Sequence, residues 1–264
     1  MQSNNPALNR SDWGRGQRLA TVPDMSAEEL QRSYETPSYT PVHERTMTVD
    51  DVVVRTLGML AVVVGMGAFS WLVLGDIGAL LALPALIIGF VLAMMIIFKW
   101  QTSAGLILTY AAVEGLFLGA VSRFYEVRFG GGIVLQAGIG TAGVFAGMAF
   151  AYKSRWIRAT PKFTRWVTGA LLGVVALMVV NLLVSVIGGG NGLGLRSGGA
   201  LAIGFSVLCI GIAALTFVLD FDQIERAVAG GAPERYAWYA SFGIVVGLIW
   251  LYLEILRLLG YLRD

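Results

Sequence analysis

The sequence predicts an all-α membrane protein with seven transmembrane helices. Hydrophobic residues make up 56% of the 264 residues and charged residues only 14%, whereas a soluble domain has about 25% charged residues. The mean hydropathy is correspondingly high, at +0.72. Seven apolar runs follow a polar N-terminal stretch, and each has the roughly 20 residues that a helix needs to cross the hydrocarbon core of a bilayer.

The N-terminal stretch differs in composition from the rest of the chain. It is polar, mixed in charge and holds most of the seven prolines. Such a segment cannot bury enough apolar surface to fold alone, so we expect residues 1–50 to form a disordered cytoplasmic tail and residues 51–264 the transmembrane domain. The stretch lacks the apolar core of a cleavable signal peptide, which makes the first helix the expected insertion signal.

The apolar runs place the seven helices along the chain, with boundaries good to a few residues. They are expected at roughly 52–74, 77–98, 104–123, 132–152, 166–187, 199–222 and 237–259.

Basic residues in the connections predict the orientation. The densest basic cluster lies between the fourth and fifth segments, and short loops rich in Lys and Arg stay in the cytoplasm. The cluster consists of Lys153, Arg155, Arg158, Lys162 and Arg165. We therefore expect the N-terminus inside and the C-terminus outside, unless the last segment re-enters the membrane and returns the C-terminus to the cytoplasm.

Glycines at small-xxx-small spacing predict helix faces that pack closely, because this spacing lets backbones approach each other in lipid. The pairs are Gly115/Gly119, Gly143/Gly147, Gly169/Gly173 and Gly243/Gly247. We interpret all of them as packing features. The glycine-rich stretch 188–199 is expected to be an outer loop, since it lacks the strand and the Gly-Lys-Ser/Thr of a phosphate-binding loop.

Acidic residues in or beside the apolar segments are the candidates for function. A carboxylate at bilayer depth is costly and needs a partner, a proton or a water-filled cavity. The candidates for an ion pathway or a pH-sensing site are Asp220, Asp222, Glu114 and Glu254.

Asp220 is the foremost of these candidates. It closes a stripe of small and polar residues on the sixth segment, formed by Ser206, Cys209, Ala213 and Thr216. This stripe must face protein or water rather than lipid. Asp220 then either borders a permeation or binding cavity, or lies at the headgroup level beside a face that only packs.

Asp222 and Glu254 are weaker candidates for an ion pathway or a pH-sensing site. Asp222 points away from Asp220, and we expect an ion pair with Arg226 one turn later. Glu254 shares the face of Gly243 and Gly247, and Arg257 can neutralise it. It lies near the outer end of its helix and Asp220 near the inner end of the preceding one, so we expect no contact between them.

Glu114 lies midway along the third segment with no cation within one turn. It is expected to be protonated or hydrogen-bonded to another helix. Asn181 and Gln136 are expected to join helices through hydrogen bonds, and Arg55 to reach the inner surface with its charged end.

The sequence argues against an enzyme. The single histidine, His43, lies in the tail, and Ser/His, HExxH and GxSxG patterns are missing. An intramembrane aspartyl protease needs aspartates from different helices, whereas Asp220 and Asp222 share one. The single cysteine, Cys209, excludes an intrachain disulfide. We expect no cofactor and no nucleic-acid partner.

Three motifs carry a resemblance to a known family. "EGLFLGAVSRFYE" in the third segment, "LDFDQI" closing the sixth and "LYLEILRLLG" in the last resemble the Bax-inhibitor-motif transmembrane family, in its bacterial branch. The similarity covers roughly residues 50–262. It implies a central last helix with six helices around it, in the inner (plasma) membrane of a bacterium.

The resemblance also implies a pH-sensitive calcium leak. In the family, an aspartate of the sixth helix and one of the seventh share a proton and control the opening of the pore. Asp220 matches the first of them, within an Asp-x-x-Gln-Ile pattern, but Gly247 stands where the second would be. Either Glu114, Asp222 or Glu254 substitutes for it, or proton gating is lost.

The expected function is therefore a slow leak of cations, with calcium bound transiently at Asp220. The alternative is a non-channel regulator that binds other membrane proteins, such as a quality-control protease, through its tail and its glycine faces. Deletion of residues 1–45 separates the two, since a pore survives it. A proton-coupled transporter is disfavoured because the sequence shows no internal repeat.

Overall fold

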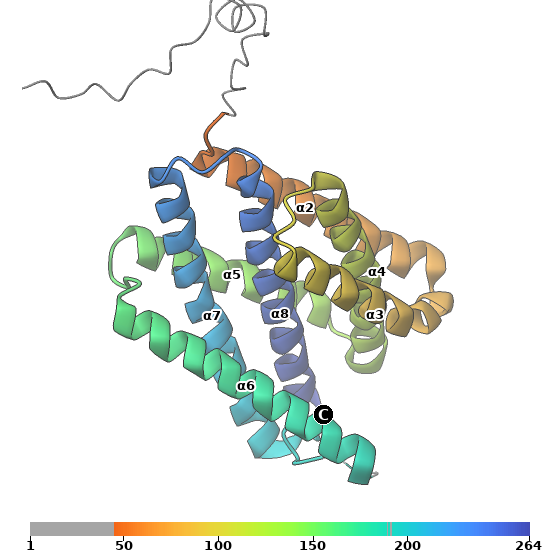
Figure 1. Ribbon diagram of the computed structural model, residues 1–264. Coiled ribbons are helices and arrows are strands. Elements are labelled where there is room, and N and C mark those ends of the chain that lie inside the picture. The colour runs from red at the N-terminus through yellow and green to blue at the C-terminus, as the bar shows by residue number, and fades with distance from the viewer. Residues whose placement is uncertain (1–44, 189, 191) are drawn as a thin grey trace, which may run out of the picture. The chain divides into compact units, whose positions relative to one another are not determined.

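The computed structural model describes residues 45–188, 190 and 192–264. Within this part the chain folds into seven long helices (Figure 1), all long and apolar enough to cross a membrane. They are α2 (Val49–Phe69, continued by the short π-helical segment η2, Ser70–Leu74), α3 (Asp76–Phe98), α4 (Ala104–Phe129), α5 (Ile133–Lys153), α6 (Pro161–Gly188), α7 (Gly199–Ala229) and α8 (Tyr236–Arg263). The predicted fold class is confirmed, whereas most of the predicted tail lies outside the described residues.

The helices extend further than the apolar runs that predicted them. α4 continues to Phe129, α6 starts at Pro161 and α7 continues to Ala229. The extra turns are polar, and hydropathy cannot locate their ends because a helix keeps its backbone hydrogen bonds in water as well as in lipid.

Helix α8 packs against four other helices, as many as α4 does. It packs against α2, α4, α5 and α7, whereas α3 packs mainly on α4 and α6 on α7. The four helices around α8 therefore form the inner part of the bundle, and α3 and α6 lie outside them (Figure 1).

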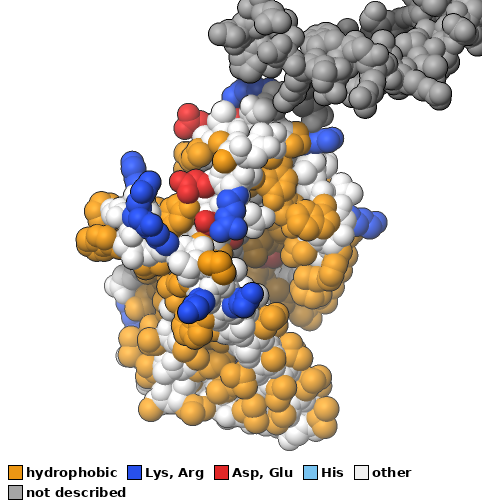
Figure 2. Space-filling view, turned by 60° about the vertical axis from the view of Figure 1, so that its left-hand side comes forward, with side chains coloured by type: hydrophobic (Ala, Val, Ile, Leu, Met, Phe, Trp, Pro, Cys, Tyr) orange, Lys and Arg blue, Asp and Glu red, His pale blue; other side chains and the backbone are white. Residues whose placement is uncertain are grey.

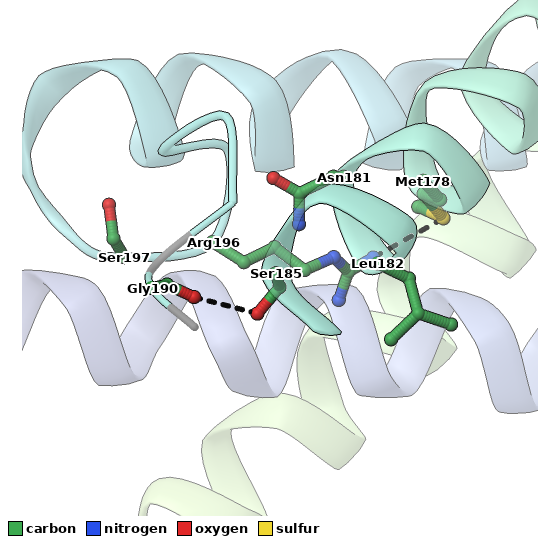
Figure 3. A pocket seen from close by; sticks show the side chains of 7 residues that line it. All are labelled: Met178, Asn181, Leu182, Ser185, Gly190, Arg196 and Ser197. Atoms are coloured by element: carbon green, nitrogen blue, oxygen red, sulfur yellow. Dashed lines mark hydrogen bonds between the residues drawn. The ribbon is translucent and has the colours of Figure 1, made fainter. Parts of the chain in front are cut away.

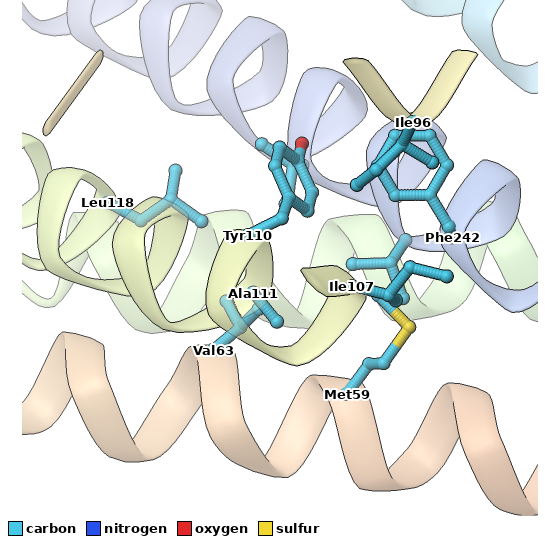
Figure 4. Close-up of a cluster of buried hydrophobic side chains, with 10 residues drawn as sticks. Met59, Val63, Ile96, Ile107, Tyr110, Ala111, Leu118 and Phe242 are labelled. Atoms are coloured by element: carbon cyan, nitrogen blue, oxygen red, sulfur yellow. The ribbon is translucent and has the colours of Figure 1, made fainter. Parts of the chain in front are cut away.

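One core cluster joins the helices on the α3 side of α8. Met59, Ile107 and Phe242 come from α2, α4 and α8, and Figure 4 shows these side chains meeting. The ring of Tyr110 on α4 packs edge-on against that of Phe242, with centroids 5.0 Å apart. This contact fixes α4 against α8.

The start of α2 is joined to the α7–α8 turn. Met47 donates its N–H to the Ala232 carbonyl at 2.8 Å, next to a bridge between Thr46 and Pro233. Arg55 donates to the Glu234 carboxylate at 2.6 Å, and its side chain is only 14% exposed. Arg55 therefore extends its charged end to the α7–α8 turn, where a carboxylate holds it, and its expected position at the inner membrane surface stays a prediction.

Helix α8 is continuous and runs from this turn to the opposite end of the bundle. There Arg263 donates to the Gly130 carbonyl in the α4–α5 connection. A helix of 28 residues without a break is long enough to cross the bilayer. The re-entrant form considered from the sequence is not what α8 adopts.

Only one of the predicted glycine pairs brings two helix backbones together. A β-carbon at Gly115 would lie 2.5 Å from the Val63 carbonyl oxygen, and one at Gly119 would lie 2.3 Å from that of Gly67. Here α4 and α2 touch through their backbones. A β-carbon at Gly143, Gly147, Gly169, Gly173 or Gly243 would meet no described atom within 4 Å. The packing predicted for these five is wrong, because the spacing permits a close approach but supplies no partner.

Candidate functional site

Asp220 lies near the end of α7 that leads into α8, and it is partly buried. Within the residues that the structure describes, its carboxylate takes part in no hydrogen bond or ion pair. The stripe that leads to it faces protein, as predicted, since Ser206 is 1% exposed and Cys209 is fully buried. Asp220 is thus a carboxyl group without a partner among the described residues, at the end of a buried polar stripe.

A group of aromatic rings lies one turn from Asp220. Phe217 is fully buried; its ring packs edge-on against that of Phe145 on α5, at 5.0 Å between centroids. The ring of Phe221 lies 6.4 Å from that of Phe217. These rings fill the interface of α5, α7 and α8 beside the acid.

Gly247 makes room for this aromatic group. A β-carbon at Gly247 would lie 2.9 Å from Cε1 of Phe217. The position at which the resemblance places a second aspartate is thus occupied by an aromatic ring from the facing helix. A carboxylate pair between Asp220 and this position is not formed.

The remaining acids of this end of α7 have partners. Asp222 pairs with Arg226 at 2.6 Å, as predicted. The Tyr152 hydroxyl, on α5, donates to the Glu225 carboxylate. Glu225 and Tyr152 are not among the residues predicted from the sequence. Glu225 was visible as a further acid one turn after Asp222, but its tyrosine partner is 73 residues away and leaves no local signal.

Glu114 lies in a different helix interface, between α4 and α3, and is 8% exposed. A β-carbon at Gly89 on α3 would lie 2.8 Å from its Oε1, so this glycine makes space for the carboxyl group. The polar neighbour of Glu114 is Tyr110, one turn earlier on the same helix. The hydrogen bond to another helix that the sequence suggested is therefore replaced by a contact within α4.

Glu254 is held at the opposite end of α8 from Asp220, and it is 1% exposed. Its Oε1 accepts from Arg257 at 2.8 Å, as predicted, and from Arg196 at 3.0 Å. Its Oε2 is buried without a partner among the described residues. The Tyr261 hydroxyl donates to the Arg196 carbonyl at 3.1 Å. Glu254 therefore joins the α6–α7 connection to α8, and it does not contact Asp220.

A pocket of about 470 Å³ lies beside this connection (Figure 3), lined by Met178, Asn181, Leu182, Ser185, Gly190, Arg196 and Ser197. The polar side chains of the pocket form hydrogen bonds with backbone groups of the α6–α7 connection. The Asn181 side chain accepts from the Leu193 N–H at 2.9 Å, and the Ser185 hydroxyl donates to the Gly190 carbonyl at 2.8 Å. The polar side chains that line the pocket therefore hold the α6–α7 connection in place. None of the four predicted acids lines the pocket.

The two polar residues expected to join helices behave differently. Gln136 on α5 accepts from Arg263 on α8 at 2.7 Å, as predicted. The prediction for Asn181 is wrong, because it lies in the last turns of α6 and the chain that follows returns to it.

The structure does not bring the four acids together. Asp220 and Asp222 share one end of α7, Glu114 lies between α3 and α4, and Glu254 lies at the far end of α8. Across the described ranges, no group of three or more His, Cys, Asp and Glu side chains is placed to hold a metal ion.

Comparison with known proteins places the chain in a family. The family model for Bax inhibitor 1 like proteins matches residues 5–264. An uncharacterized protein of Chlamydia muridarum (strain MoPn / Nigg) is 36% identical over 81 residues, which cover 31% of this chain and 34% of that protein. The match thus spans about a third of that relative. Because the family model covers nearly the whole chain and the described part has seven apolar helices, this chain belongs to the Bax inhibitor 1-like family.

Proposed function

We propose that this protein lets cations leak slowly across the membrane and that Asp220 is the acid that attracts them. Calcium is the ion that resemblance to leak channels of its family implies. The observation that carries the proposal is an acid in an apolar helix that has no partner in the described protein. Such an acid is tolerated only with water, a proton or a passing cation beside it.

The neighbouring charges make Asp220 distinct from the other acids of α7. Asp222 is neutralised by Arg226, and Glu225 accepts from Tyr152. Asp220 therefore keeps its charge available to an ion. Calcium takes six to eight oxygen ligands, so an ion at Asp220 would retain water as most of its ligands and would bind only in passing.

The aromatic group beside Asp220 supports a slow leak. Phe217 is fully buried against Phe145 and against the space left by Gly247. A hydrated ion cannot pass through packed rings, so conduction requires them to move apart. The same packing leaves no second aspartate to share a proton, and the pH response then depends on Asp220 alone.

Asp220→Asn is expected to reduce calcium flux into liposomes by about tenfold or more. A unit charge about 4 Å from an ion interacts with it by about 4 kcal/mol near a protein surface, and each 1.36 kcal/mol of barrier is tenfold in rate. Protonation removes the same charge, so wild-type flux should rise from mildly acidic to mildly alkaline buffer. The variant should be insensitive to this change. A dye trapped in the vesicles measures both effects.

Asp222→Asn is the matched control, because it makes the same substitution two residues later at a carboxylate that Arg226 already neutralises. It should keep most of the flux. Flux no greater than that of empty vesicles would refute the proposal, as would an Asp220→Asn variant that conducts like wild type at both pH values.

A further inference from the structure

The turn between α5 and α6 carries a dense positive charge that no side chain of the described residues pairs with. All five cations between residues 153 and 165 are exposed, and none of their side chains joins an ion pair or hydrogen bond in the described part of the chain. No acidic residue lies between residues 153 and 166. Glu225, an acid of α7, accepts a hydrogen bond from Tyr152 at the end of α5.

Exposed aromatic rings accompany these cations. Trp156 is 79% exposed and Trp166 62% exposed, and the ring of Trp156 packs edge-on against that of Phe150, at 5.9 Å between centroids. Lys162 and Trp166 are one helical turn apart on α6, so a cation and a ring share one face. Tryptophan is enriched at the membrane–water interface, where its ring lies at the headgroup level.

The backbone at the end of α5 places a cation, Arg155, in the left-handed conformation. Arg155 has φ 61°, and the N–H of Trp156 donates to the Ala151 carbonyl at 3.0 Å, closing the helix. Glycine is the usual residue at this position because a β-carbon is strained there. An arginine in this conformation points to a role for its charge.

We propose that this basic turn, residues 150–166, binds the headgroups of anionic phospholipids in the leaflet that it faces. Exposed cations match the phosphates, and the tryptophan rings match the boundary with the acyl chains. The position also favours lipid over a soluble anion, because the turn directly joins two membrane-spanning helices. Figure 2 shows Lys and Arg side chains close to a surface covered largely by hydrophobic ones.

Native mass spectrometry of the full chain in detergent tests the proposal, with phosphatidylglycerol and phosphatidylcholine of the same acyl chains as probes. The wild type should bind phosphatidylglycerol at least tenfold more tightly. A triple variant, Arg158→Gln with Lys162→Gln and Arg165→Gln, should lose most of this preference, since each cation near the surface contributes about fivefold. Arg128→Gln should keep it, because Arg128 lies at the other end of the bundle, near Asp264.

Arg155→Gly separates binding from folding. Glycine relieves the strained backbone, so the melting temperature should rise while binding of phosphatidylglycerol falls about fivefold. The proposal is overturned if both lipids bind equally or if the triple variant binds phosphatidylglycerol like wild type. It is also overturned if inorganic phosphate at equal concentration displaces the lipid, which would indicate a site for free phosphate.

Discussion

Gly119→Ala is expected to destabilise the protein by about 3 kcal/mol, the upper range for forcing a methyl group into a packed interior. The added β-carbon would lie 2.3 Å from the Gly67 carbonyl oxygen and 2.7 Å from the Ser70 β-carbon. Neither atom can turn aside, because one is backbone and the other is fixed to it. Helices α2 and α4 would have to separate along the contact. Thermal unfolding in detergent, followed by tryptophan fluorescence, measures the loss.

Gly147→Ala is the matched control for this substitution. It is the same change in a glycine that also belongs to a small-xxx-small pair, but a β-carbon there meets no described atom within 4 Å. The expected change is within about 0.5 kcal/mol, as for substitutions away from packed features. Equal destabilisation by both variants would show that the α2–α4 contact is not as close as the structure has it.

This pair of glycines shows what the sequence could and could not predict. The spacing Gly115/Gly119 identified the face of α4 on which a second helix lies. At the identical spacing in Gly143/Gly147, no described atom lies within 4 Å of either β-carbon position. Period and composition are properties of one segment, whereas a close contact also depends on where a distant segment lies. The seven helices were predictable because lipid makes each span satisfy its own backbone hydrogen bonds.

The contacts of the charged residues also fall into those that the sequence predicts and those that it does not. The pairs Asp222–Arg226 and Glu254–Arg257 were predictable because three or four residues along a helix bring side chains to one face. Arg196, the second partner of Glu254, is 58 residues away in a glycine-rich connection. The resemblance drew attention to Gly247, but only the structure shows Phe217 in the space beside it.

Glu254→Ala is expected to destabilise the protein by about 3 kcal/mol. Breaking a buried ion pair by removing one partner costs about 3–5 kcal/mol, because the other charge stays buried without compensation. The lower end applies here, since the side chains of Arg257 and Arg196 keep 22% and 29% of their surface exposed. Urea unfolding in detergent gives the value, and limited proteolysis should show faster cleavage between α6 and α7, where Arg196 is released.

Two further variants identify the source of this loss. Asp264→Ala removes an exposed carboxylate that lies 3.8 Å from Arg128 at the same end of the bundle, and it should change stability by less than about 0.5 kcal/mol because exposed pairs contribute little. Arg196→Ala should be less harmful in a protein that already lacks Glu254 than in the wild type, since the shared contact is then gone. Additive losses would mean that Arg196 and Glu254 act independently. The connection between α6 and α7 would then be held by Asn181 and Tyr261, and the buried Glu254 carboxylate would stabilise the protein only through its ion pair with Arg257.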